Sequence, residues 1–398
     1  MRIAMLSDFH LGYERFREDA YRQAKEALET AAASADVLLI PGDIFDNRHP
    51  TPDVLAEAIN LFRDLSRRTW KAHVVSFTGE GRSYTSIPII AIPGTHERRA
   101  EGVEDPVDLL GLAGLLVDAT NASVVVEKDG EQIAVRGLGG IADDRFREIV
   151  ARENPKPVGG MFNVLFFHQS VYELLPFDKN FIRTDELPEG FDLYVNGHIH
   201  GKVEAKAHGK PFLISGSTVL TQLKAGEQEP KGFFIYDTVT GGYTFNKIRS
   251  RRFVLLKLNI DGREPAQIEG DIERLVRENC SDDKPILRIE ISGKLKAGYK
   301  NIQIETQEII RRLSGYATVE IGRDGIEVAG TDRDRDGDGI ALSDGASIKD
   351  YGLGVFAERL RENGYSLDKN PGELFDILSS EGSKEKAVKR AMDLLLGQ

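Results

Sequence analysis

Short apolar runs alternate with longer amphipathic stretches over residues 1–250. The amphipathic stretches have helical composition and spacing, and they predict helices at residues 16–33, 52–65, 105–116 and 143–152. The apolar runs have the length of buried strands, and they predict strands at residues 3–6, 37–40, 87–92, 164–167, 193–195, 212–214, 232–236 and 243–248. A mixed sheet, or two stacked sheets flanked by helices, accommodates this order of elements best.

A second series of alternating elements follows the basic residues 249–252. It predicts strand, helix, strand, helix and strand at residues 253–260, 266–278, 285–291, 301–313 and 316–321. A series of this length is sufficient for a small separate α/β domain. We therefore expect a first domain at residues 1–250 and a small α/β domain at residues 251–330.

The remaining chain divides into an acidic segment and a helical one. The Asp332–Asp338 run resembles a calcium-binding loop, but the glutamate that such a loop needs at its twelfth position is missing. We predict an acidic linker at residues 331–346, and whether it binds a cation stays open. Residues 347–398 predict helices whose apolar stripes need a cover, either the chain's own domains or a partner protein.

Composition narrows the class of protein only slightly. The chain has 398 residues, which favours two or three domains, and its net charge of −12 argues weakly against a nucleic-acid partner. Cys280 is the only cysteine, which excludes a disulfide framework and a thiolate zinc site. No apolar stretch approaches the roughly 20 residues of a membrane span, so we expect a soluble, cytoplasmic protein.

The candidate chemistry lies directly after five of the predicted strands. Five of the eight histidines fall in short motifs there, together with several aspartates. The motifs are Asp8-Phe9-His10, Gly42-Asp43-Ile44-Phe45-Asp46, Gly94-Thr95-His96-Glu97, His168 and Gly197-His198-Ile199-His200. Strand ends on one edge of a sheet lie close together, and gathered carboxylates and imidazoles repel or desolvate one another unless a cation lies between them. The pattern predicts a metal centre with two ions.

The spacing within the motifs suggests roles for individual residues. Asp8 and His10 are two apart on a segment that we expect to be extended, so their side chains would point the same way. Asp43 follows a glycine, where the backbone can turn sharply and the carboxylate can bridge two ions. His96 stands beside the ligands and suits protonation of a leaving oxygen. Asp46 is either a ligand or a residue that orients one.

Taken in order, these motifs resemble those of the calcineurin-like metallophosphoesterases. The flanking segments SDFHLG, GDIFDNRHPTP and FFHQS, with the small α/β region and the helical tail, resemble the archaeal DNA double-strand-break nucleases of the meiotic-recombination-eleven and SbcD type. The resemblance implies a sandwich of two mixed β-sheets flanked by helices, an α/β (α+β) fold. It further implies a capping domain at residues 251–330 and a partner-binding helical segment at residues 347–398.

The resemblance also implies how the site residues divide between two ions. Asp8, His10, Asp43 and His200 would hold one ion, and Asp43, His168 and His198 the other. His96 would be the catalytic histidine, and the ions would be Mn²⁺. The implied activities are a 3′–5′ exonuclease on duplex DNA and a single-strand endonuclease. The implied partners are DNA, a coiled-coil ATPase of the SMC type and a second copy of the chain.

One position departs from the pattern of the resemblance. The family usually has asparagine where this chain has Thr95, and that asparagine supplies a carbonyl oxygen to the second ion. A threonine hydroxyl is a shorter and weaker donor. We therefore expect a weaker second metal site at Thr95, completed by water.

Basic residues near the motifs are candidates for contact with DNA phosphates. They are Arg48, Arg98, Arg99, Arg251 and Arg252. Two alternatives to a nuclease stay open at this point. The first is a phosphatase or phosphodiesterase for small substrates on the same centre, and the second is a DNA-binding scaffold with an impaired second metal site.

Overall fold

The computed structural model describes residues 1–79, 84–99, 103–176, 178–281, 284–296, 298–299 and 304–327. The linker predicted at residues 331–346 and the helical segment predicted at residues 347–398 lie outside the described residues.

The first sheet has six strands in the order β13-β12-β1-β2-β4-β5. They are β1 (Arg2–Met5), β2 (Val37–Pro41), β4 (Ile89–Ile92), β5 (Val117–Asp118), β12 (Gly232–Asp237) and β13 (Tyr243–Lys247). Strands β1, β2, β4 and β5 are parallel, whereas β12 and β13 pair antiparallel at one side. The sheet is therefore mixed, and its parallel strands end at a common edge.

The second sheet has seven strands in the order β10-β11-β9-β8-β7-β6-β3. They are β3 (His73–Phe77), β6 (Ser123–Lys128), β7 (Glu131–Leu138), β8 (Phe162–Phe167), β9 (Leu193–Asn196), β10 (Val203–Ala207) and β11 (Lys210–Ile214). Its four central strands are parallel, and β3, β6 and β10 pair antiparallel. Two mixed sheets confirm the predicted fold class.

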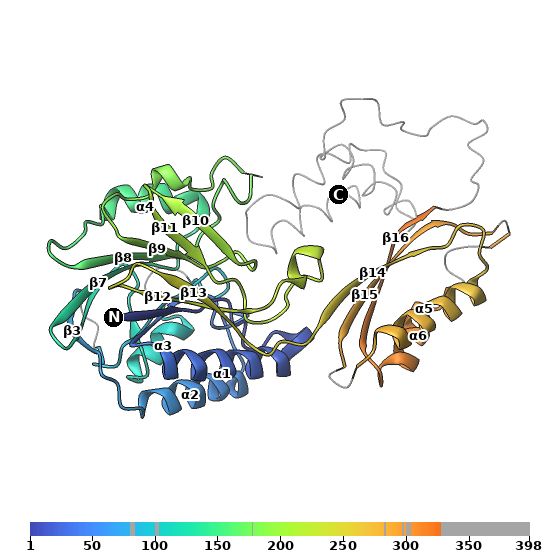
Figure 1. Ribbon diagram of the computed structural model, residues 1–398, viewed down its shortest axis with the longest axis horizontal. Coiled ribbons are helices and arrows are strands. Elements are labelled where there is room, and N and C mark those ends of the chain that lie inside the picture. The colour runs from blue at the N-terminus through green and yellow to red at the C-terminus, as the bar shows by residue number, and fades with distance from the viewer. Residues whose placement is uncertain are drawn as a thin grey trace, which may run out of the picture. The chain divides into compact units, whose positions relative to one another are not determined.

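The central strands of each sheet are buried on both faces, which explains the continuous apolar runs in the sequence. In β1, Ile3 and Met5 pack into a core that includes Val164 and Val195 of the second sheet. The alternate residue Ala4 packs into a core formed with the helices α1 (Arg17–Ser34), α2 (Pro52–Ser66) and α3 (Pro106–Leu112). Helix α4 (Asp143–Glu153) packs through Phe146 on the outer face of the second sheet. The layers are therefore helices, sheet, sheet and helix (Figure 1).

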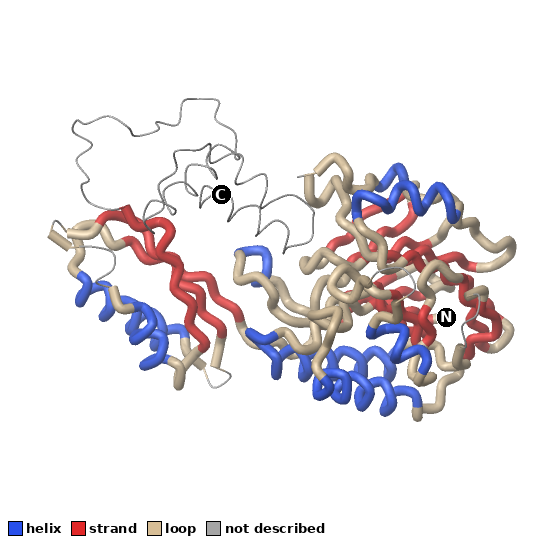
Figure 2. Tube along the Cα trace, turned by 180° about the vertical axis from the view of Figure 1, so that it is seen from behind, coloured by secondary structure: helices blue, strands red, loops and turns tan. Residues whose placement is uncertain are grey.

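The small α/β region has a core of its own. Its parallel strands β14 (Phe253–Asn259), β15 (Ile286–Lys294) and β16 (Thr318–Glu327) alternate with the helices α5 (Pro265–Asn279) and α6 (Thr306–Leu313). Ile268, Ile272 and Ile309 of the helices pack against Ile289 and Ile291 of β15. Figure 2 shows both helices on one face of this sheet. The predicted alternation of strands and helices is confirmed, whereas the assignment of residues 251–330 as a separate domain stays a prediction.

The apolar pattern of the sequence did not predict β3, β5, β6, β7 or β10. In β6 buried residues alternate with half-buried ones, which gives a weaker apolar signal than the runs of the central strands. The turn between β6 and β7 contains Asp129 and Gly130, both with a positive φ of 53° and 83°. An Asp-Gly pair is a strong local signal for a hairpin, so this hairpin could have been predicted from the sequence.

Two carboxylates at the start of α3, those of Asp105 and Asp108, make the stability of the fold depend on pH. Asp105 caps the helix by accepting hydrogen bonds from the backbone N–H groups of Val107 and Asp108. The Asp108 carboxylate accepts one in return from the Asp105 N–H at 2.8 Å. Burial, followed by the charge of the neighbouring carboxylates, raises the pKa of Asp105 to about 6 and that of Asp108 to about 7.

We expect Asp108→Asn to stabilise the protein above neutral pH. A carboxyl whose pKa is raised by folding binds its proton more tightly in the folded state, so stability falls as pH rises from about 4 through about 7. Asparagine keeps the acceptor and removes the charge. Urea unfolding should show the variant gaining about 1 kcal/mol over wild type at pH 8 and little at pH 4. The exposed Asp129→Asn is the control, and a gain independent of pH would contradict the explanation.

Candidate metal centre

The motif residues follow the carboxyl ends of five parallel strands, namely β1, β2 and β4 of one sheet and β8 and β9 of the other. Asp8, His10, Asp43 and His198 adopt the left-handed backbone region, with φ of 55°, 48°, 51° and 71°. The extended segment predicted for Asp8 and His10 is therefore wrong. Each such residue costs about 1–3 kcal/mol, and such strain is concentrated at functional sites. Tight turns after the strands, rather than the alternation of side chains along an extended strand, determine the direction of these four side chains.

Three glycines allow these turns to lie against one another. A Cβ on Gly42 would lie 2.4 Å from His168 Nδ1, and one on Gly197 would lie 2.1 Å from the carbonyl oxygen of Pro41. A Cβ on Gly94 would lie 2.3 Å from Asp43 Oδ1. The motif glycines are therefore needed for close approach of the backbone, because any side chain there would displace a candidate ligand.

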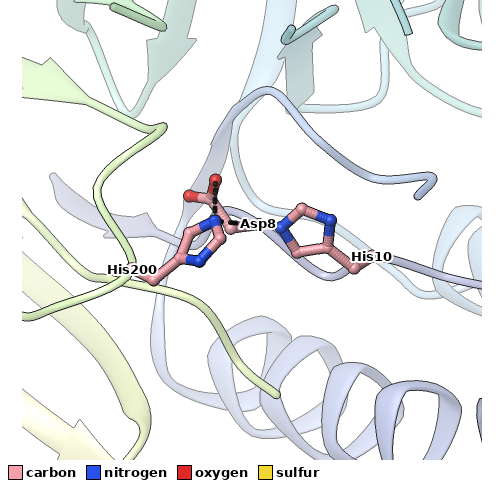
Figure 3. Close-up of side chains that lie close together, drawn as sticks. All are labelled: Asp8, His10 and His200. Atoms are coloured by element: carbon pink, nitrogen blue, oxygen red, sulfur yellow. Dashed lines mark hydrogen bonds and ion pairs between the residues drawn. The ribbon is translucent and has the colours of Figure 1, made fainter. Parts of the chain in front are cut away.

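The first group of candidate ligands comprises Asp8, His10 and His200, whose ligand atoms lie within 4.8 Å of one another. Figure 3 shows the three side chains directed toward one point. His10 Nε2 is 3.2 Å from His200 Nε2, which in turn is 3.8 Å from Asp8 Oδ1. Burial, then the charge of His10, lowers the pKa of His200 to about 2, so its ring is neutral as a ligand must be. Two facing ring nitrogens beside a carboxylate suit a cation between them.

Asp43, His168 and His198 form the second group. His168 Nδ1 lies 2.7 Å from the carbonyl oxygen of Pro41 and therefore carries a proton, which directs Nε2 into the site. Among the described residues, that buried Nε2 has no hydrogen-bond partner, although Asp43 Oδ2 lies 3.2 Å away. An orphaned buried nitrogen beside a carboxylate fits a divalent cation.

The pKa shifts of Asp43 and His168 in this second group also support a cation site. Burial alone would raise the pKa of Asp43, but the positive charge of His168 outweighs burial and lowers that pKa. Burial would lower the pKa of His168, and the charge of Asp43 instead raises it to about 10. The positive charge of a protonated His168 thus takes the place of the charge that a bound cation would supply to Asp43. The charges of His10, a member of the first group, and of His96 also lower the pKa of Asp43.

Asp46 connects the first group with His96. Its carboxylate lies 3.2 Å from His10 Nδ1, and its backbone carbonyl oxygen accepts a hydrogen bond from His96 Nδ1 at 2.8 Å. Burial would lower the pKa of His10, and the hydrogen bond with Asp46 contributes most to raising it instead. Asp46 thus contacts the outer nitrogen of a candidate ligand. His10, Asp46 and His96 also form a third cluster that could hold an ion.

Thr95 and His96 lie at the exposed side of the site. The Thr95 hydroxyl is 3.3 Å from His198 Nδ1, so Thr95 contacts a residue of the second group. The His96 side chain is 44% exposed, and its ring lies edge-on to that of His10 with centroids 4.9 Å apart. These two side chains are the accessible members of the site, whereas Asp8, Asp43 and His168 are buried.

Glu97, to which the sequence motifs assign no role, is fully buried. Its carboxylate accepts hydrogen bonds from the backbone N–H groups of Asp43, Phe45 and Gly94 at 3.1, 2.9 and 2.8 Å. Burial and then the charge of Asp43 raise its pKa, while the N–H bonds oppose that rise. Glu97 joins the loops after β2 and β4. The only signal in the sequence was its position in Gly94-Thr95-His96-Glu97.

The predicted DNA-contacting arginines fall into two sets. Arg99 donates two hydrogen bonds to the backbone carbonyl oxygen of Arg48, at 3.2 and 2.7 Å, and lines a cavity of about 430 Å³ together with Arg98. Arg251 instead pairs with Asp19 at 2.6 Å, and Arg252 donates to a backbone carbonyl in the small α/β region. Arg48, Arg98 and Arg99 therefore lie together, whereas Arg251 and Arg252 are engaged elsewhere.

Acidic and imidazole side chains that converge at the ends of parallel strands from two mixed sheets define a metallophosphoesterase. A family model described as calcineurin-like phosphoesterase matches residues 1–202, and the chain belongs to this family. Over the described residues, no helix has both the length and the apolar character that crossing a membrane requires.

Curated relatives carry the name of a DNA double-strand break repair protein, Mre11. The one from Methanopyrus kandleri is 30% identical over 70% of this chain and 62% of its own length. The one from Encephalitozoon cuniculi is 29% identical over 74% of this chain and 57% of its own length. The one from Saccharolobus solfataricus is 24% identical over 74% of this chain and 76% of its own length. The chain thus spans under two thirds of the length of the first two relatives.

We expect Gly94→Ala to weaken metal binding, because its methyl group would overlap the Asp43 carboxylate. Overpacking of this kind costs about 1–3 kcal/mol, so Mn²⁺ affinity should fall by about tenfold or more. Isothermal titration calorimetry on metal-free protein measures the change. Gly159→Ala is the matched control, since a Cβ there meets nothing within 4 Å in the part of the chain that the structure describes. Equal affinities for the two variants would contradict the steric explanation.

Proposed function

We propose that this protein is a two-metal, Mn²⁺-dependent DNA nuclease that processes DNA ends in double-strand-break repair. The observation that carries the proposal is the pair of candidate ligand groups beside the exposed His96. Membership of the calcineurin-like phosphoesterase family supports phosphodiester chemistry, and the names of the curated relatives support DNA as the substrate. We further propose 3′–5′ exonuclease activity on duplex DNA and endonuclease activity on single strands.

In this proposal, Asp8, His10, Asp43 and His200 hold one ion, and Asp43, His168 and His198 the other. Asp43 is a buried member of the second group, and the charge of His10 from the first group lowers its pKa, which supports a bridging role for its carboxylate. When bound, two divalent ions would stabilise the charge on the phosphodiester oxygens and acidify an attacking water. The remaining chemistry falls to residues of the chain itself.

His96 is proposed to donate a proton to the leaving oxygen. The Asp46 carbonyl oxygen accepts from Nδ1, so the ring orientation is fixed and Nε2 remains for the substrate. The His96 backbone N–H donates to Asp43 Oδ1 at 2.9 Å, which fixes the position of this loop relative to a candidate ligand. A ring that is 44% exposed can reach a phosphodiester at the surface.

The partners in the proposal come from the resemblance and from the names of the relatives. Arg48, Arg98 and Arg99 would contact phosphates of double-stranded ends or single strands, which a net charge of −12 does not favour by itself. Residues 347–398 would bind a coiled-coil ATPase of the SMC type, and residues 251–330 would act as a capping domain. We also propose a homodimer that acts in the cytoplasm.

His96→Ala should lower DNA cleavage by about 10²–10⁴-fold and leave Mn²⁺ binding at the two proposed positions unchanged, because general acid catalysis is lost while the candidate ligands of those two ions remain. The measurement is digestion of end-labelled duplex and single-stranded DNA with and without Mn²⁺. The exposed His73→Ala in β3 is the control and should cleave like wild type.

The same assay separates the alternatives. Fast hydrolysis of a small aryl phosphodiester with no cleavage of DNA would favour a phosphatase-like enzyme. Unchanged DNA processing by His96→Ala in the complex with the ATPase would favour a DNA-binding scaffold. Either result would contradict the proposed nuclease.

Thr95→Asn should lower the Mn²⁺ concentration needed for half-maximal cleavage, on the order of tenfold. An asparagine carbonyl extends further than the Thr95 hydroxyl, which contacts His198 at 3.3 Å, and is a stronger donor to a metal ion. Thr95→Val, which removes the hydroxyl and keeps the shape, should raise the midpoint. If all three proteins share one midpoint, Thr95 does not act at the second ion.

A further inference from the structure

We propose that Thr221, fixed by the buried pair Glu227 and Lys231, is a positioning residue that sets the tautomer of His200 and thereby the affinity of one metal position. The inference rests on the proposed metal centre. It concerns a segment that none of the five sequence motifs includes, between β11 and β12.

The direction of the hydrogen bonds determines where the proton of His200 lies. The Thr221 hydroxyl donates its only hydrogen to Glu227 Oε1 at 2.9 Å. The same hydroxyl is hydrogen-bonded to His200 Nδ1, and in that bond it can only accept. His200 Nδ1 therefore carries the proton and Nε2 keeps its lone pair. Nε2 is the nitrogen that faces His10 and Asp8, so this tautomer is the one that can bind a cation there.

Glu227 is constrained to act as an acceptor. It is 9% exposed, and it also accepts hydrogen bonds from the backbone N–H groups of Thr221 and Gln222 at 3.1 and 2.8 Å. Lys231, which is 5% exposed, lies 3.3 Å from Glu227 Oε2 and donates to Ser217 Oγ at 2.9 Å. A buried carboxylate paired with a buried ammonium has no hydrogen to donate, so the Thr221 hydroxyl must point toward it.

Apolar packing fixes the loop on its other side. Val219, Leu220 and Leu223 lie in a buried cluster with Phe16 and Phe253. The Tyr13 hydroxyl also donates to the Thr221 carbonyl oxygen at 2.9 Å. With its backbone held by these contacts, Thr221 has little freedom to reorient, and the tautomer of His200 is set before a cation arrives.

The test is a titration of Mn²⁺ into the metal-free, full-length chain by isothermal titration calorimetry. Wild type should bind two ions. Thr221→Val keeps the shape and removes the hydroxyl, so binding of one ion should weaken by about 10–100-fold while the other is unchanged. Thr221→Ser keeps the hydroxyl and should behave as wild type. Thermal unfolding of the metal-free proteins should be similar for all three.

A second variant, studied by NMR, tests the tautomer of His200 directly. In Glu227→Gln combined with Lys231→Met, the amide can donate to Thr221 and release the hydroxyl hydrogen toward His200. The ¹⁵N NMR signals of His200 in metal-free protein should then show protonated Nε2, whereas wild type should show protonated Nδ1. This measurement does not depend on nuclease activity.

Each outcome bears on a defined claim. Two-site binding by wild type with identical titrations for Thr221→Val and Thr221→Ser overturns this inference and leaves the proposed function intact. Equal weakening at both sites with a lower unfolding temperature also overturns it, since Thr221 would then be structural. If wild type binds no Mn²⁺, the proposed function and this inference both fail.

Discussion

The structure depends on one electrostatic constraint, the gathering of buried acids and imidazoles where two sheets meet. Asp8, Asp43 and His168 are each almost fully buried, at 0%, 1% and 2% exposure. Charged groups in such a place are costly unless each has a partner of opposite charge. The partner of Asp43 is a protonated His168, whose Nε2 lies 3.2 Å from Asp43 Oδ2. The Nε2 atoms of His10 and His200 face each other at 3.2 Å. A pair of divalent cations would satisfy all of these groups together.

The fold supplies the rigidity that this arrangement needs. Five parallel strands, three in one sheet and two in the other, deliver the candidate ligands to one place. Left-handed turns, close glycine contacts and the buried Glu97 then fix how the loops lie against one another. The apolar cores on both faces of each sheet stabilise the strands enough to offset the strain in these turns. The site is therefore organised by backbone before any ion is added.

Much of this could be predicted from the sequence, because it is local. Apolar runs located the central strands, and acidic and imidazole residues directly after them indicated a metal centre. What the sequence did not reveal depends on contacts between distant residues. The left-handed backbone at Asp8, the role of Glu97 under two loops and the contact of Thr221 with His200 each require the folded chain. The ligand assignments themselves stay predictions, and residues 347–398 lie outside the described structure.

Anomalous diffraction from crystals soaked in Mn²⁺ tests the central claim most directly. Our account predicts two anomalous peaks about 3.5–4 Å apart. Asp43 should lie between them, with Asp8, His10 and His200 around one peak and His168 and His198 around the other. An absence of peaks at these side chains, with Asp43 and His168 remaining paired at saturating Mn²⁺, would contradict it.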